Sequence, residues 1–156
     1  MSNKPALLST VPFSSFSQWD VKQFFFAKIL SKYPVEELGK HLIHQTEKIQ
    51  LSDEPTKEFT ILGVSNKIGM FDGSTEKGSK IKQKYHVVKD NWLAYNPYRI
   101  NVGSIGIKTP NLKGSYISPA YVVFSCKDTI LPEYLWLMMK SDFFNKLIKD
   151  STTGSV

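Results

Sequence analysis

One short segment combines amide, guanidinium, phenol and hydroxyl side chains between two strand-like stretches. Residues 95–106 read Tyr-Asn-Pro-Tyr-Arg-Ile-Asn-Val-Gly-Ser-Ile-Gly. Asparagine pairs with adenine, arginine with guanine or phosphate, and serine with bases or backbone. Glycine lets backbone N–H groups approach a phosphate closely. The segment therefore suits contact with nucleic acid, although a plain turn with an exposed arginine fits the same residues.

The charge balance supports a polyanionic partner. The chain has 156 residues, a formal net charge of +6 and 20 basic side chains, of which only Arg99 is an arginine. A basic surface favours nucleic acid moderately, because many proteins that bind none carry a similar charge. Lysine serves for solvated charge, whereas arginine suits planar, bidentate recognition. The position of the sole arginine within residues 95–106 therefore strengthens that segment as a binding site.

The patterns that would indicate catalysis are incomplete. Asn96-Pro97-Tyr98 is similar to the Asn-Pro-Pro-Tyr motif of adenine-N6 methyltransferases, but it lacks the second proline, and no glycine-rich loop follows an early strand to hold S-adenosylmethionine. No phosphate-binding loop or paired-cysteine spacing occurs. The acids of residues 53–58 suit a solvated loop better than a nuclease centre. The sequence predicts no enzyme activity and no cofactor.

Metal and membrane binding are not predicted either. His41 and His44 are spaced to share a helix face, but no further ligand has a recognisable spacing, so solvated polar residues are the better interpretation. The single cysteine, Cys126, lies in an apolar run and reads as a small buried hydrophobe. No run approaches the ~20 apolar residues of a membrane span, and no signal peptide is recognisable. We expect a cytoplasmic protein.

The hydrophobic pattern predicts an α+β fold in one domain. Residues 1–15 are expected to be irregular, and residues 16–156 to form a single domain with a bent, mainly antiparallel or mixed sheet, flanked by N-terminal helices and one C-terminal helix. The expected helices are Ser17–Lys32, Val35–His44 and Glu133–Lys149. The expected strands are Glu58–Ser65, Lys84–Val88, Asn91–Tyr95 and Ala120–Ser125, with turns at Asn66–Gly73 and Thr109–Gly114 and a mobile basic loop over residues 73–84.

Several pieces, in this order, resemble one protein family. They are residues 16–25 (Phe-Ser-Gln-Trp-Asp-Val-Lys-Gln-Phe-Phe), residues 33–39 (Tyr-Pro-Val-Glu-Glu-Leu-Gly), the 95–106 segment, residues 117–124 (Ile-Ser-Pro-Ala-Tyr-Val-Val-Phe), and residues 131–135 with 151–156. The chain resembles a target recognition domain of the specificity subunit of type I restriction–modification enzymes. Residues 96–106 are similar to that family's Asn-Pro-x-Arg-x-x-x-Gly-x-x-Gly pattern.

The resemblance implies a role in reading DNA. In that family two such domains, joined by long helices, each read half of a split duplex DNA site. Modification subunits supply the methyltransferase, and a restriction subunit supplies the motor and cleavage. This sequence has one such domain and no long spacer helices, so we expect an excised domain, a truncated gene product or half of a subunit.

Residue types suggest how the contacts divide. Amide, guanidinium, phenol and hydroxyl groups would meet the DNA near the bases, and lysines would hold phosphates. The predicted DNA-binding residues are Asn66, Lys67, Lys80, Lys82, Lys84, Asn96, Tyr98, Arg99, Asn101, Ser104 and Lys108. Two alternatives remain open: the specificity region of a single-chain restriction–methyltransferase fusion, and a protein-interaction domain that exposes the apolar side of helix 133–149.

Overall fold

A computed structural model describes residues 32–151, apart from the side chains of Asn101 and residues 149–151. Residues 1–31 and 152–156 lie outside the described part, and so does nearly all of the helix predicted at Ser17–Lys32. The elements below all belong to one compact unit, Glu36–Val156.

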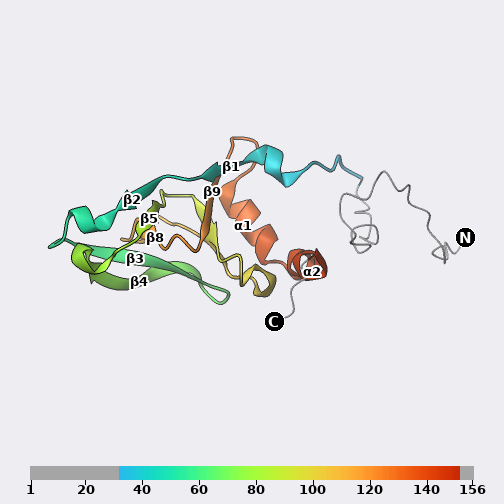
Figure 1. Cartoon of the computed structure of the whole chain (residues 1–156). Coiled ribbons are helices and arrows are strands. Elements are labelled where there is room, and N and C mark those ends of the chain that lie inside the picture. Colours follow the sequence, from blue (N-terminus) through green and yellow to red (C-terminus); the bar gives the residue numbers. More distant parts are fainter. Residues whose placement is uncertain (1–31, 152–156) are drawn as a thin grey trace, which may run out of the picture. The chain divides into compact units, whose positions relative to one another are not determined.

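The described strands form two sheets (Figure 1). The first has the order β1-β9-β6-β7 and is antiparallel throughout. The second has the order β2-β5-β8-β3-β4 and is mixed, because β8 runs parallel to β3. The strands are β1 (Leu42–Gln45), β2 (Lys48–Gln50), β3 (Glu58–Ser65), β4 (Gly69–Lys77), β5 (Lys84–Val87), β6 (Leu93–Tyr95), β7 (Ile105–Ile107), β8 (Tyr116–Ile117) and β9 (Val122–Cys126).

Helices α1 (Pro132–Lys140) and α2 (Asp142–Ser151) complete the elements, with short 3-10 turns at Leu38–His41, Leu51–Asp53, Gly78–Lys80 and Ile100–Val102. Neighbouring residues on β6 face opposite ways, as the strand period requires. Leu93 packs with Leu135 and Met139 of α1, while Ala94 packs with Leu62 of β3. The four-stranded sheet is therefore the middle layer between the helices and the five-stranded sheet.

A third, smaller cluster lies away from these two. Leu51, Phe59 and Ile81 are buried there, and the Phe59 and Tyr116 rings meet edge to face with centroids 5.5 Å apart. This cluster fixes the end of the five-stranded sheet where β4 runs into the 3-10 turn Gly78–Lys80. The lysines that follow thus extend from an ordered segment.

The α+β class and the predicted strands around residues 58–65, 84–88, 91–95 and 120–125 are confirmed. Other predicted elements are wrong. Val35–His44 is not a helix but a short 3-10 turn running into β1, because β1 makes its hydrogen bonds with the distant strand β9. The predicted turn over Asn66–Gly73 and loop over residues 73–84 are instead a tight turn, the nine-residue strand β4, and a 3-10 turn.

The predicted C-terminal helix is also wrong in one respect, because it is broken at Ser141. That residue has extended φ and ψ of −68° and 151°. Its hydroxyl donates to the Met138 carbonyl at 2.6 Å and accepts from the Phe144 N–H at 3.2 Å. A serine that satisfies a free N–H at the start of a helix is a strong N-cap, so α2 begins anew with its own direction.

Candidate nucleic-acid interface

The connection between β6 and β7 is an ordered turn held by its own backbone. The Asn96 N–H donates to the Ser104 carbonyl at 3.2 Å, and the Ser104 N–H donates to the Arg99 carbonyl at 3.1 Å. Gly103 has φ of +77°, a conformation that favours glycine. We call residues 96–104 the arginine turn. Its internal hydrogen bonds hold its backbone in one shape.

Tyr98 and Arg99 project from the arginine turn into solvent. The Tyr98 residue is 82% exposed, and Arg99 is also exposed. The Asn96 side chain is partly committed, since its Oδ1 accepts the Tyr98 N–H at 2.9 Å in a local turn of the kind asparagine favours. Its amide nitrogen is the group left to meet a ligand. Asn101 belongs to this turn, but its side chain lies outside the described part.

A second turn, residues 65–69, joins β3 to β4 and lies beside the arginine turn (Figure 1). Its Ser65 hydroxyl accepts the Ile68 N–H at 3.2 Å, and Gly69 has φ of +79°. Asn66 and Lys67 are exposed. We call residues 65–69 the hairpin turn. The structure therefore brings together two groups of predicted contact residues that are some thirty positions apart in the sequence.

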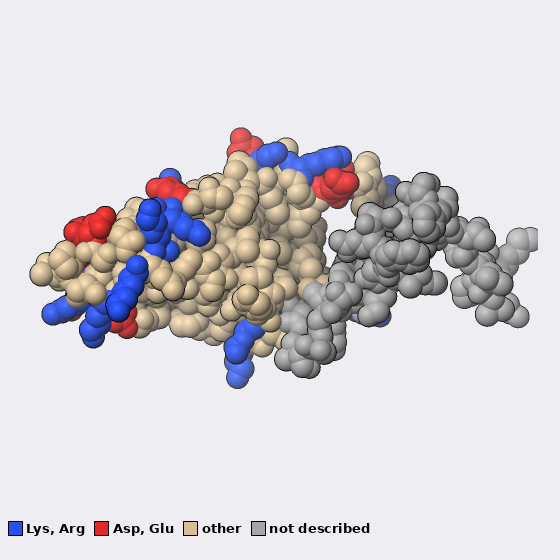
Figure 2. Space-filling view, viewed as in Figure 1, with Lys and Arg blue, Asp and Glu red and all other residues tan. Residues whose placement is uncertain are grey.

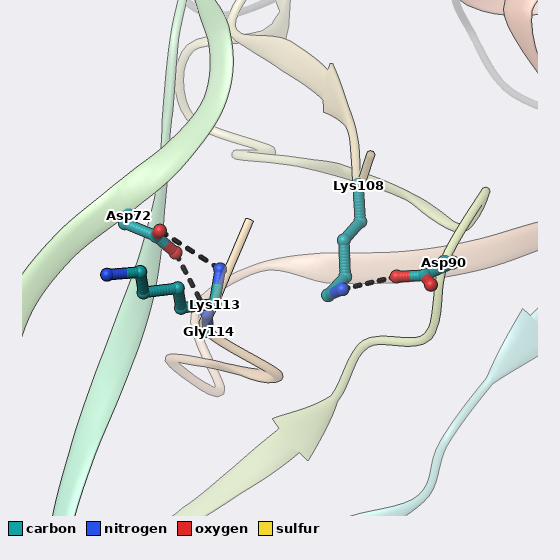
Figure 3. A network of polar contacts seen from close by, with 5 residues as sticks. All are labelled: Asp72, Asp90, Lys108, Lys113 and Gly114. Atoms are coloured by element: carbon teal, nitrogen blue, oxygen red, sulfur yellow. Dashed lines mark hydrogen bonds and ion pairs between the residues drawn. The ribbon is translucent and has the colours of Figure 1, made fainter. Parts of the chain in front are cut away.

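Two of the predicted contacts are buried. Ser104 is 3% exposed, and its hydroxyl donates to the Val64 carbonyl at 3.3 Å. Lys108 is 5% exposed, and its ammonium is paired with the Asp90 carboxylate (Figure 3). A buried charge needs a partner, and Asp90 supplies it. Both side chains were predicted to contact DNA, but each is buried and has an internal partner, so neither lies on the surface in this arrangement.

Asp72 forms another anchor near Lys108 (Figure 3). Its carboxylate accepts the backbone N–H groups of Lys113 at 3.0 Å and Gly114 at 2.8 Å. Burial alone would raise the pKa of Asp72, but these two donors and the nearby charges of Lys113 and Lys108 together hold that pKa below its usual value. The contact fixes the turn after β7 to strand β4.

Lys80, Lys82 and Lys84 lie at the opposite end of the two sheets from the arginine turn (Figure 1). All are exposed. Lys80 and Lys82 border an open hollow of about 490 Å³ that Glu76 also lines. In Figure 2, basic and acidic side chains are interspersed over this end of the molecule. On the face drawn in Figure 2, basic side chains do not form one continuous stripe from this end of the molecule to the other. We call Lys80, Lys82 and Lys84 the lysine end.

The histidines do not form the predicted shared helix face. The His41 Nδ1 lies 2.8 Å from the Thr129 hydroxyl, and its Nε2 lies 3.3 Å from a Glu36 carboxylate oxygen, whereas His44 belongs to strand β1. In the described part of the chain, no group of three or more histidine, cysteine or acidic residues could hold a metal ion. Nor is any described helix long and apolar enough to cross a membrane.

Cys126 was predicted to be a small buried hydrophobe; it is half-buried and packs against the core cluster that includes Leu135 and Met139 of α1. Burial raises the pKa of its thiol, and the negative charge of Glu133 raises it further. A thiol with a raised pKa carries little thiolate, which is the nucleophilic form. The environment of Cys126 therefore suits packing.

Sequence reasoning missed Lys140, the last residue of α1. Its ammonium donates to the Asn66 carbonyl in the hairpin turn and, at 3.3 Å, to the Gly103 carbonyl in the arginine turn. A lysine at a helix C-terminus is an ordinary sequence feature, so no local signal marks it. The break at Ser141 was readable, because Ser-Asp before an apolar pair is typical of a helix start.

Two solved structures share this fold. One is a chain from a study of complex assembly and conformational transition of the type I R-M system, with 20% identity, a TM-score of 0.58, and coverage of 74% of this chain and 31% of that chain. The other is the HsdS subunit from Thermoanaerobacter tengcongensis, with 21% identity, a TM-score of 0.59, and coverage of 76% and 32%. No family model and no curated protein matches the sequence.

These similarities confirm the predicted resemblance at the level of the fold. The chain therefore has a fold that is also found in part of the HsdS subunit from Thermoanaerobacter tengcongensis. It spans about a third of the length of the two matched chains.

Proposed function

We propose that this chain binds duplex DNA sequence-specifically, as a target recognition domain whose partner subunits carry out methylation and cleavage. One observation carries the proposal: an exposed arginine and an exposed tyrosine project from an ordered turn, beside a second exposed turn with Asn66 and Lys67. Guanidinium and amide groups on a backbone held by its own hydrogen bonds suit the reading of base edges. The shared fold with an HsdS subunit supports the same role. Such a role would place the chain in the cytoplasm.

The proposed contacts divide by chemistry. Arg99 would read a base edge, assisted by the free amide nitrogen of Asn96 and by Asn101. Tyr98 would pack on a sugar or base, and Asn66 and Lys67 would reach the adjoining groove or phosphate. Lys80, Lys82 and Lys84 would contact the DNA backbone only where the duplex extends or bends past the lysine end. The proposed set leaves out Ser104 and Lys108.

The test begins with selection of preferred sequences from a randomised duplex library by the full chain. Binding of the selected duplex and of a scrambled duplex is then measured by fluorescence anisotropy across a salt series. We expect Arg99→Ala to lose about 1–3 kcal/mol of discrimination between the two duplexes. Arg99→Lys keeps the charge but loses the planar fork, so it should restore general affinity without restoring discrimination.

The matched control is Lys146→Ala, which removes one exposed positive charge from α2. It should leave discrimination unchanged. Because one domain makes only part of the contacts of a linked pair, weak binding by the full chain is expected, and a tandem fusion of two copies raises the effective concentration. If the tandem chain selects no preferred sequence, the proposed function is wrong. If Arg99→Ala keeps the same affinity and selects the same sequence, the assignment of Arg99 as a base-reading residue is wrong.

A second candidate function is protein docking through α1. Leu131, Tyr134 and Leu137 are 71%, 62% and 62% exposed along one side of the helix, while Leu135 and Met139 on the other side are buried. Exposed apolar patches mark interaction sites. Under this alternative, Tyr134→Lys with Leu137→Lys would abolish binding of a modification subunit, while DNA discrimination would persist. Unchanged assembly would argue against it.

A further inference from the structure

Helix α1 lies against both exposed turns through two side chains that are one helical turn apart. The Trp136 indole N–H points to the Ile105 carbonyl of β7, with nitrogen and oxygen 3.4 Å apart. The same ring lies against Gly69 at the end of the hairpin turn, where a Cβ would stand 3.1 Å from Trp136 Cζ2. Residues at i and i+4 share a helix face. Lys140 therefore lies on the same face of α1 as Trp136 and is directed toward the two turns.

Lys140 joins the backbones of the two turns directly. Its ammonium donates to the carbonyl of Asn66 in the hairpin turn and to the carbonyl of Gly103 in the arginine turn. Carbonyl oxygens accept strong hydrogen bonds from an ammonium because the donor is charged. Both acceptors are backbone atoms, so the contact fixes the backbone of the hairpin turn relative to the backbone of the arginine turn.

The strands that lead into the two turns are already close to each other without Lys140. A Cβ on Gly106 would stand 2.2 Å from the Met70 backbone nitrogen, so β7 and β4 pass each other at backbone distance. Ser104 adds its hydroxyl bond to the Val64 carbonyl. These contacts set the crossing point of the strands. The tips, which carry Asn66 and Arg99, extend beyond that point and gain the Lys140 bridge.

The break between α1 and α2 presents Lys140 at this place. Lys140 is the last residue of α1, and the Asn145 side-chain amide donates to its carbonyl at 3.4 Å. Asn145 also lies over Gly103, with its Oδ1 3.4 Å from the position of a Cβ there. The junction between α1 and α2 therefore contacts the arginine turn at Gly103, whose carbonyl also accepts the hydrogen bond from Lys140.

We propose that Lys140 is a positioning residue that holds the hairpin turn and the arginine turn as one rigid surface. The DNA-reading part of this proposal rests on the proposed function, and the mechanical part does not. The rival role is a phosphate contact, because an ammonium has three donors and two are used here. The two roles differ in what they predict for local opening and for salt dependence.

The first experiment measures hydrogen exchange of the full chain without DNA. In Lys140→Met, amides of residues 65–70 and 99–105 should exchange about tenfold faster, the scale expected when a charge-assisted hydrogen bond is removed. Amides of β5, which lies in the other part of the five-stranded sheet, should be unchanged. Lys140→Arg retains charged donors and should keep much of the protection. The control Lys146→Met removes an exposed lysine of α2.

The second experiment compares DNA binding by the same variants with the selected and scrambled duplexes. Lys140→Met should lose discrimination by about tenfold while the dependence of log affinity on log salt stays as in Lys146→Met. A phosphate contact would instead lower affinity for both duplexes alike and reduce the salt slope by about 1. That result would overturn the positioning role.

The two proposals fail in different ways. Faster exchange in both turns without any selected DNA sequence would uphold the bridge and reject the proposed function. Faster exchange in only one turn, or in neither, would overturn the bridge while leaving the effect of Arg99→Ala as an independent measure of DNA reading. If Lys140→Met also lowers the thermal midpoint strongly, the comparison is made with Lys140→Gln at a temperature where both variants are folded.

Discussion

The arginine turn and the lysine end were predicted to serve one DNA surface, yet they are built differently. The arginine turn carries a phenol, a guanidinium and amides on a backbone that bonds to itself and receives Lys140 from α1. The lysine end is also ordered, since the Gly78 N–H donates to the Lys57 carbonyl at 2.9 Å. Its exposed groups, however, are mainly long lysine chains.

This difference separates two kinds of DNA contact. Discrimination between sequences needs different donors and acceptors held in fixed positions, whereas attraction to phosphate needs only positive charge. A lysine chain loses conformational freedom when its ammonium is fixed, so it is poorly suited to reading one base. The arginine turn with the hairpin turn therefore suits specificity, and the lysine end suits general affinity.

The largest expected effect is a loss of stability when a tightly packed glycine next to the arginine turn or the lysine end is replaced by alanine. Gly106→Ala would place a Cβ 2.2 Å from the Met70 backbone nitrogen, and Gly78→Ala would place one 2.3 Å from the Glu54 carbonyl oxygen. Both neighbours are backbone atoms, so strand β7 or β4 must shift in the first variant and one of the 3-10 turns in the second. We expect each change to lower the free energy of unfolding by about 3 kcal/mol or more, measured by urea denaturation.

Gly39→Ala is the matched control, because no heavy atom of the described residues, apart from Gly39 itself and its chain neighbours, lies within 4 Å of the added Cβ. At a temperature where the variants remain folded, Gly106→Ala should also disturb amide chemical shifts in the arginine turn, and Gly78→Ala those in the lysine end. Equal unfolding midpoints for Gly106→Ala and Gly39→Ala would contradict the close approach of β7 to β4.

The next prediction compares the lysines, which should affect general DNA affinity, with Arg99, which should affect discrimination between sequences. Replacing Lys80, Lys82 and Lys84 together by alanine should weaken binding of selected and scrambled duplexes alike. It should also reduce the salt slope by nearly 1 for each phosphate that the variant no longer binds. Arg99→Ala should instead lose about 1–3 kcal/mol of discrimination. Anisotropy titrations over a range of salt concentrations measure both quantities.

A triple lysine variant with an unchanged salt slope would show that the DNA does not reach the lysine end. A triple variant that loses discrimination would show that the lysine end and the arginine turn act together in reading the DNA sequence.

A smaller effect marks where the binding surface stops. Lys108 was grouped with Arg99 by sequence, but its buried ammonium is paired with Asp90, whose side chain is 53% exposed. Asp90→Ala leaves a buried charge without its partner, so we expect a loss of about 1–2 kcal/mol in unfolding free energy. Lys108→Met replaces the charge by an apolar chain of similar volume and should cost less than about 1 kcal/mol.

Guanidinium denaturation would blur this comparison through its salt effect, so urea is the better denaturant. DNA discrimination should be the same in Lys108→Met as in the unmodified chain. A selective loss of discrimination would return Lys108 to the contact set.

Strands were predictable from the local sequence where an apolar pattern is bounded by residues typical of turns. Residues 58–65 and 120–125 are of this kind. Prediction failed where the partner is remote, as in β1, whose Leu42 pairs with Cys126. The polar strand β4 also escaped prediction, because its glycine, serine and threonine residues read as a loop until β3 pairs with them.

The candidate site was predictable in part for the same reason. The arginine turn is local, so its residue types and glycines were readable from the sequence. Asn66 and Lys67 of the hairpin turn were also among the predicted contacts. The packing of that turn beside the arginine turn, and the Lys140 bridge between them, are set by tertiary structure. Exposure also depends on packing, which is why Ser104 and Lys108 seemed available although both are buried.

The smallest expected effect concerns pH and the five-stranded sheet near the lysine end. His86 of β5 is 5% exposed, and its Nδ1 has no hydrogen-bond partner within the part of the chain that the structure describes. Burial lowers the pKa of His86 below 6.5, the charges of Lys48 and His44 lower it further, and the Glu47 backbone offsets part of the shift. The neutral form is therefore the one that the folded protein favours.

Because the folded pKa of His86 is lower than the unfolded value, its contribution to stability is complete above about pH 6.5 and is lost as the pH falls from there toward the folded pKa. His86→Leu should remove this part of the pH dependence in urea denaturation between pH 7 and pH 5. His41→Gln, at a more exposed histidine beside Thr129, should retain it. The loosening should appear first in β2 and β5, where His86 pairs with Lys48, and leave the arginine turn protected from exchange. If amide hydrogen exchange at pH 5 increases equally in β2, β5 and the arginine turn, the two ends of the molecule open as one unit, and the prediction of local loosening is wrong.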